Sequence, residues 1–164
     1  MEYFGRGPAE NYLDRNAGSM IGLYKSTAEE LYFPYVRPQE NGHHTDTRWV
    51  SLSTGKKGLL IQADNTIGFN ALRNSIEDFD DEEATGLPRQ WSNFTPEQVA
   101  NHDEAAAKSV LRRQHHINDI TPRDFVEVCV DLKQQGVAGY DSWGSRPEPA
   151  YTFPANREYN WGFT

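Results

Sequence analysis

The sequence predicts a mainly β-structured fold, and three observations support this. Apolar and polar residues alternate with a period of two in several short segments. Loops containing glycine, asparagine or proline separate these segments. Aromatic residues make up 12% of the chain although hydrophobic residues reach only 37%, so large rings must fill much of the core. At 164 residues the chain suits one domain, which we expect to span residues 1–164.

The alternating segments predict the strands in order. Residues 49–53 form one strand, the loop 54–58 has hairpin length, and residues 59–63 return from it. We expect a turn at 65–66 to lead into a further strand over 67–71. The clearest strand covers 125–132, and the tail 159–163 alternates as well. We expect no strand ahead of Gly5, since the chain opens directly into a glycine-rich segment.

One helix interrupts the strands, near residues 95–113. Thr95, Pro96 and Gln98 have the pattern of a capping box with proline at the first helical position. The apolar stripe that follows is thin, so we expect an inserted surface helix. The preceding run 77–83 lacks the glycine of a calcium-binding loop, because Glu83 stands in its place, and it is predicted to be a solvated acidic loop.

Charge and cysteine content exclude several functions. A net charge of −8 argues against partners with phosphate backbones and against anionic membranes, so we expect neither nucleic acid nor membrane as a partner. The chain has no apolar run of 18 residues. Cys129 is the single cysteine, which rules out an internal disulfide and a thiolate zinc site.

The histidines and the missing motifs give no further chemistry. The five histidines show no ligand spacing, and we expect them on the surface, with no metal site in this chain. The chain carries no nucleophile-elbow motif and no glycine-rich phosphate loop. The histidines are His43, His44, His102, His115 and His116.

The segment 139–147, G-Y-D-S-W-G-S-R-P, is the most informative. Its glycines, aspartate, serine and proline predict a tight irregular loop that carries Trp143. An indole on such a loop can lie against the apolar face of a sugar ring, while its polar neighbours meet the sugar hydroxyls. The competing interpretation is a tryptophan that folds back as a lid on the core.

Four carboxylates lie near glycines and aromatics and could supply a glycosidase pair: Glu10, Asp14, Glu40 and Asp141. Glu10 and Glu40 each precede an asparagine in a turn-like setting. There a carboxylate accepts backbone N–H groups or pairs with an arginine, which lowers its pKa and makes it a poor general acid. The arginines within reach in sequence are Arg6, Arg15, Arg37 and Arg48. We therefore expect no catalytic residue in this chain.

Four ordered blocks carry a resemblance to the glycoside hydrolase family 2 β-galactosidases. Residues 5–15, G-R-G-P-A-E-N-Y-L-D-R, resemble that family's G-x-G-P-x-E-N-Y-x-D-R block. Residues 35–42, with Thr47-Arg48-Trp49 after them, and residues 123–137 resemble the next blocks. The D-S-W-G loop at 141–144 completes the match. Tyr140 departs from it, because the family has a charged or small residue there.

The resemblance implies a fold and a role. The fold would be an antiparallel β-sandwich similar to galactose mutarotase, with this chain forming the later part of a C-terminal domain. Trp143 would stack on galactosides, and Asp141 and Ser142 would hold its loop by hydrogen bonds. The remaining matched blocks would be turn and ion-pair scaffolding, with the residues Glu10, Asp14, Glu40, Asn41 and Arg48. The catalytic glutamates and the magnesium and sodium ligands would lie in other domains, which would be partners of this chain. The alternatives are a stand-alone carbohydrate-binding module and a purely architectural domain.

A partial sandwich would expose strand edges and apolar surface, so self-association is expected, and a homo-oligomer is possible. The compartment stays open between bacterial cytoplasm and periplasm.

Overall fold

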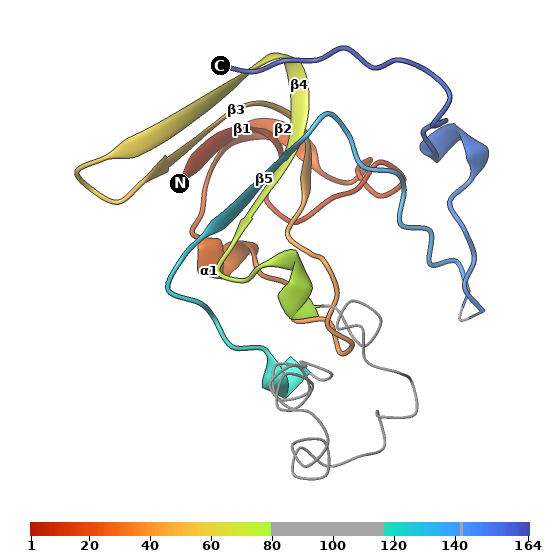
Figure 1. Ribbon diagram of the computed structural model, residues 1–164, viewed down its shortest axis with the longest axis horizontal. Coiled ribbons are helices and arrows are strands. Elements are labelled where there is room, and N and C mark those ends of the chain that lie inside the picture. The colour runs from red at the N-terminus through yellow and green to blue at the C-terminus, as the bar shows by residue number, and fades with distance from the viewer. Residues whose placement is uncertain (80–116, 142) are drawn as a thin grey trace, which may run out of the picture. The chain divides into compact units, whose positions relative to one another are not determined.

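The fold is mainly β, as predicted: five strands form one antiparallel sheet in the order β2-β1-β3-β4-β5 (Figure 1). The structure is a computed structural model that describes residues 1–79, 117–141 and 143–164, so the predicted helix near 95–113 lies outside the described residues. The strands are β1 (Glu2–Gly7), β2 (Met20–Lys25), β3 (His44–Ser53), β4 (Gly58–Leu72) and β5 (Glu127–Asp131).

The chain divides into two compact units. The first comprises residues 1–33, 41–72 and 127–164 and holds the whole sheet. The second comprises residues 34–40 and 73–126. Among the described residues, no helix is long and apolar enough to cross a membrane.

The hairpin between β3 and β4 is confirmed. β3 ends at Ser53 and β4 begins at Gly58, and the Thr54 N–H donates to the Lys57 carbonyl at 2.9 Å. Gly55 takes a φ of 88°, a conformation that glycine adopts without steric cost. The hairpin projects at the left of Figure 1.

The turn expected at 65–66 is wrong, because β4 runs unbroken from Gly58 to Leu72. Thr47 pairs with Ile67, whereas Trp49 pairs with Gln62. Two residues along β3 therefore correspond to five along β4. The extra residues of β4 form a bulge that contains the polar residues Asn65 and Thr66. Polar residues such as Asn65 and Thr66 occur both in turns and in bulges, so the apolar–polar alternation of the sequence does not distinguish the two structures.

The predicted tail strand is present only as an isolated bridge between Ala63 and Phe163. The Asp64 N–H donates to the Gly162 carbonyl at 3.0 Å, and Gln62 and Thr164 exchange two backbone hydrogen bonds of 2.7 and 2.8 Å. The C-terminal segment therefore runs along β4 beside its bulge.

The expectation of no opening strand is also wrong. β1 pairs with β2 along its whole length and with β3 at Glu2, Tyr3 and Phe4. Gly5 lies so close to Thr47 that a Cβ there would come within 2.5 Å of its hydroxyl, so the glycine permits this strand packing. A glycine-rich opening thus marks a tightly packed strand.

The core lies on one face of the sheet. Tyr3, Val50 and Phe69 are fully buried there, and the rings of Tyr3 and Phe69 meet edge to face at 5.1 Å. The short helix α1 (Ala28–Leu31) adds Leu31, which is also buried, to the core. A capping box fixes the start of α1: the Thr27 hydroxyl accepts from the Glu30 N–H, and the Glu30 carboxylate accepts from the Thr27 N–H.

In the second unit, the prediction of a solvated acidic run is wrong at Asp78. This residue ends up only 6% exposed, and its carboxylate accepts hydrogen bonds from the guanidinium of Arg123. Burial, the largest single influence, raises the pKa of Asp78, but hydrogen bonds from Arg123, Asn74 and the Ser75 N–H outweigh it and leave the pKa below its usual value. Arg123, 45 residues away in sequence, therefore allows the Asp78 carboxylate to be buried.

Candidate functional site: the Trp143 loop

The loop that carries Trp143 starts from an anchored base. One oxygen of the Asp14 carboxylate accepts the Val137 N–H at 3.0 Å, and the other accepts the Ala138 N–H at 2.8 Å. Gly136 allows this contact, because a Cβ there would come within 2.5 Å of that carboxylate. The Gly136 N–H also donates to the Tyr151 carbonyl at 2.8 Å. Residues 136–138 are thus tied to two distant segments of the first unit.

The loop itself is shaped by left-handed backbone and by an aspartate. Ala138, Gly139 and Gly144 have φ values of 54°, 86° and 84°. One oxygen of Asp141 accepts the Trp143 N–H at 2.7 Å, and the Ser145 N–H lies 3.4 Å from the same oxygen. This is an Asx-type turn that holds the backbone of the tryptophan. Ser142 lies outside the described residues.

Trp143 is 93% exposed. The competing interpretation, a tryptophan lid on the core, is therefore wrong for this structure. Tyr140 in the same loop is 60% exposed. Asp14 positions the base of the loop, and the indole of Trp143 is almost fully open to solvent.

Two other scaffold candidates, Glu10 and Asn41, accept hydrogen bonds from backbone N–H groups. The Glu10 carboxylate accepts the Gly42 N–H at 2.8 Å and the Tyr12 hydroxyl at 3.4 Å. Asn41 is 1% exposed, and its side-chain oxygen accepts the Phe33 N–H at 2.9 Å. These bonds join the residue 10–12 segment and the residue 33 segment to the turn that leads into β3.

Two of the arginines near these blocks, Arg6 and Arg48, contact Asp46. Arg48 donates to the Asp46 carbonyl at 2.5 Å and lies over the Phe4 ring, 5.6 Å from its centre. The Arg6 side chain pairs with the Asp46 carboxylate at 2.6 Å. Glu40 is half-buried in the second unit.

Two histidines contradict the expectation of surface positions. His43, which precedes β3, and His44, the first residue of β3, are completely buried. Burial lowers the pKa of His43 to about 4, with neighbouring His44 contributing. Burial also lowers the pKa of His44, against the opposing effects of its hydrogen bond to the Arg6 carbonyl and of Glu10. Alternation along β3 could have indicated that His44 is buried, but His43 precedes the strand and its burial does not follow from that pattern.

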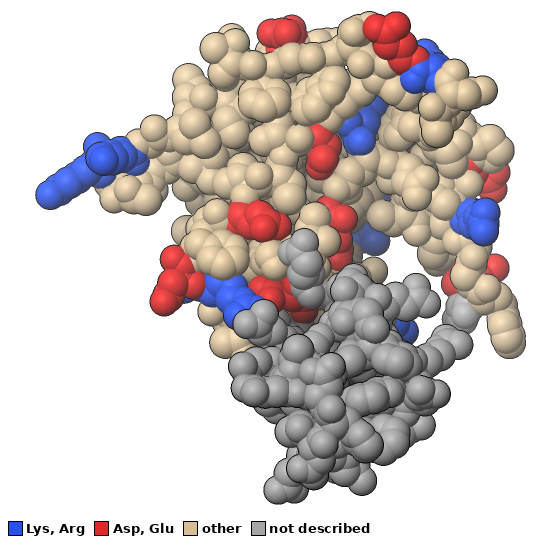
Figure 2. Space-filling view, in the orientation of Figure 1, with Lys and Arg blue, Asp and Glu red and all other residues tan. Residues whose placement is uncertain are grey.

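Charges are interspersed rather than gathered. Figure 2 shows acidic and basic side chains scattered over the visible face of the described residues, with the lysines of the β3–β4 hairpin tip projecting at the left. Within the described ranges, no three His, Cys, Asp or Glu side chains come together in a group that could hold a metal ion.

Comparison with known proteins decides the family. The family described as "Beta galactosidase small chain" matches residues 1–164, the whole chain. The chain belongs to this family. The β-galactosidase of Priestia megaterium is 33% identical over 165 residues, which cover all of this chain and 13% of that protein. The β-galactosidase of Streptococcus thermophilus is 28% identical, covering 99% of this chain and 13% of that protein.

The β-galactosidase of Arthrobacter sp. strain B7 is 40% identical over 82 residues, covering 46% of this chain and 8% of that protein. The chain therefore spans about 13% of the length of the relatives that match it throughout. The four sequence blocks correctly identified this family.

Proposed function

We propose that this small-chain segment forms one wall of the sugar site of a β-galactosidase and stacks the indole of Trp143 on galactose. The exposure of that indole, 93%, is the observation that carries the proposal. Its loop is held at the base by Asp14 and around the tryptophan by Asp141. A ring presented on an anchored loop loses little conformational freedom when a ligand covers it, so more of the contact energy appears as affinity.

The complete enzyme would hydrolyse terminal non-reducing β-D-galactose residues with retention, which requires an acid and a nucleophile. In this chain Glu10, Asp14 and Asp141 already accept backbone N–H groups and act as structural carboxylates. We propose that the reacting carboxylates, and the magnesium and sodium ligands that the resemblance implies, lie in further polypeptide.

A second layer would complete the sandwich on the outer face of the sheet. Phe4 lies between Leu23 and Trp49 on neighbouring strands, and Leu60 lies nearby on β4 opposite Ser51. Phe4, Leu23 and Leu60 are 37%, 62% and 57% exposed. Contiguous apolar residues of this kind mark a surface that another element covers. We propose that a further sheet of the same enzyme does so.

The first test uses the chain alone. With a nitrophenyl β-galactoside we expect no turnover; turnover that disappears on changing Glu10 or Glu40 would contradict the assignment of the chemistry to other domains. Tryptophan fluorescence titrated with lactose then tests the binding-module alternative. A response that Trp143→Ala abolishes would show that the chain binds sugar unaided.

A further inference from the structure

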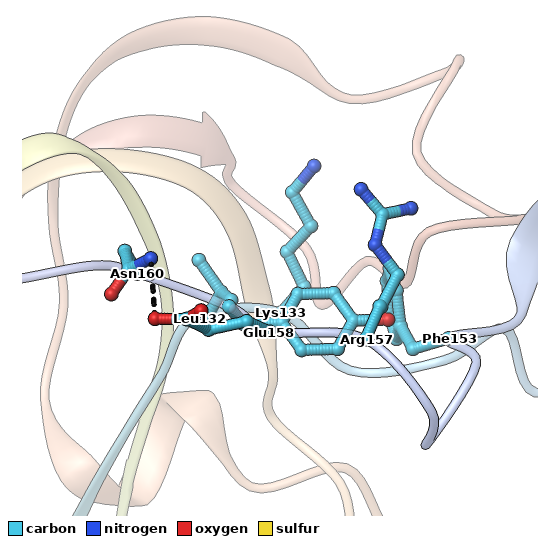
Figure 3. A pocket seen from close by; sticks show the side chains of 7 residues that line it. Leu132, Lys133, Phe153, Arg157, Glu158 and Asn160 are labelled. Carbon is cyan, nitrogen blue, oxygen red and sulfur yellow. Dashed lines mark hydrogen bonds between the residues drawn. The ribbon is translucent and has the colours of Figure 1, made fainter.

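A groove lies among residues to which the sequence assigned no binding role, and no residue of the Trp143 loop lines it. A groove of about 510 Å³ opens between the end of β5 and the C-terminal segment (Figure 3). This volume falls in the range of small-molecule sites, roughly 300–1,000 Å³. Its lining residues all belong to the described part of the first unit and are Leu132, Lys133, Phe153, Arg157, Glu158, Tyr159 and Asn160.

The walls of the groove are aromatic and fixed. The rings of Phe153 and Tyr159 meet edge to face at 6.2 Å and 89°. The Tyr159 hydroxyl donates to the Pro154 carbonyl at 2.9 Å, which holds this ring in place. Leu132 adds an aliphatic side. Together they offer an apolar surface suited to the body of a pyranose ring.

The charged side chains of the groove are separated from one another. Figure 3 shows Lys133 and Arg157 extending in the same direction, while Glu158 turns toward Asn160. The Glu158 carboxylate accepts a hydrogen bond from the Asn160 amide at 3.2 Å. Arg157 lies over the Tyr159 ring, 5.3 Å from its centre. The groove thus presents two cations on one side and a hydrogen-bonded amide–carboxylate pair on the other.

Lys133 and Arg157 both line the groove. Among the described residues, neither Lys133 nor Arg157 forms an ion pair with a carboxylate. Unpaired cations beside an aromatic wall are suited to an anionic group carried on a ring. We propose that this groove binds a phosphorylated pyranose, with the phosphate on Lys133 and Arg157, the ring against Tyr159 and Phe153, and hydroxyls on Glu158 and Asn160.

Calorimetric titration of the 164-residue chain with galactose 6-phosphate, galactose and inorganic phosphate tests the proposal. We expect the sugar phosphate to bind. Galactose lacks the phosphate and inorganic phosphate lacks the sugar ring, so each should bind at least about tenfold more weakly. Lys133→Ala and Arg157→Ala should each weaken binding about tenfold or more. Arg146→Ala is the matched control, since it removes an exposed arginine outside the groove, and it should leave the affinity unchanged.

Circular dichroism of each variant separates lost binding from lost fold, and Arg157→Lys, which keeps the charge, should retain part of the affinity. The Trp143→Ala variant should bind the sugar phosphate normally, so this site and the proposed galactose stacking can fail independently. No binding of galactose 6-phosphate would overturn the proposal. Equal binding of inorganic phosphate, or binding of an acidic peptide in its place, would overturn it too.

Discussion

The buried histidine His43 makes a quantitative prediction about acid stability. Its ring is completely buried and stacks on Tyr12 at 5.6 Å, and neither ring nitrogen has a hydrogen-bond partner among the described residues. Gly68 lies so close that a Cβ there would come within 2.5 Å of the imidazole. The Asp131 carboxylate stands 4.0 Å from Nδ1, too far for a hydrogen bond, so burial prevails and the pKa falls to about 4.

The sign of the effect follows from this depressed pKa. Above pH 6.5 the imidazole is neutral in both the folded and the unfolded chain, so it contributes no pH dependence. Between pH 6.5 and 4 the unfolded chain takes up a proton that the folded chain does not, and stability falls with pH. A difference of about 2.5 pKa units corresponds to a loss of roughly 3 kcal/mol at pH 4. His44, whose pKa is also lowered, adds in the same direction.

Urea unfolding followed by tryptophan fluorescence, at several pH values from 7.5 to 4.5, measures this loss. The His43→Leu variant should keep its stability at pH 7.5 and lose less than the parent chain on acidification. Keeping the pH above 4.5 limits interference from carboxylates. If both proteins lose the same free energy over this window, or if the His43 ring titrates near pH 6.5 by NMR, the reasoning is refuted.

Three further predictions follow from the described contacts. Asp14→Ala removes two carboxylate hydrogen bonds and should cost about 2 kcal/mol, with faster hydrogen exchange at residues 137 and 138; unchanged exchange would refute the anchor. Arg123→Ala leaves the buried Asp78 carboxylate without its cation and should cost about 3 kcal/mol in urea unfolding; a cost below about 1 kcal/mol would argue against this. The chain alone should self-associate in sedimentation velocity through its apolar outer face, and the Phe4→Ser variant should self-associate less. A parent chain that stays monomeric at high concentration would contradict the proposal that this face is normally covered by another element.

Periodicity predicted the strands whose pattern is simple. In the 125–132 segment apolar residues recur at every second position from Val126, and the structure has β5 within it at Glu127–Asp131. The hairpin loop 54–58 follows from its length and glycines, and both strands beside it are present. β1 was missed because Gly5 and Gly7 occupy inward positions where a strand usually shows apolar side chains. These positions have no room for a side chain, which only the packed neighbours Thr47, Tyr3 and Tyr24 reveal.

Local sequence also could not show long-range contacts. Asp14 meets residues 137 and 138 from the far end of the chain, and Asp78 meets Arg123 across 45 residues. The groove beside Tyr159 combines two segments that are at least 20 residues apart in sequence. The Trp143 loop could be predicted because its turn is built from neighbouring residues: Asp141 holds the Trp143 N–H two positions away.

The central claim is that Trp143 touches the sugar, and steady-state kinetics of a β-galactosidase containing this chain tests it most directly. A sugar covering one indole face would remove about 100 Å² of apolar surface from water, worth about 2 kcal/mol. Trp143→Ala should therefore lower kcat/KM roughly 30-fold. Trp161→Ala, in the C-terminal segment and 45% exposed, is the matched control and should have little effect. An unchanged kcat/KM in Trp143→Ala, or an equal loss in both variants, would contradict the account.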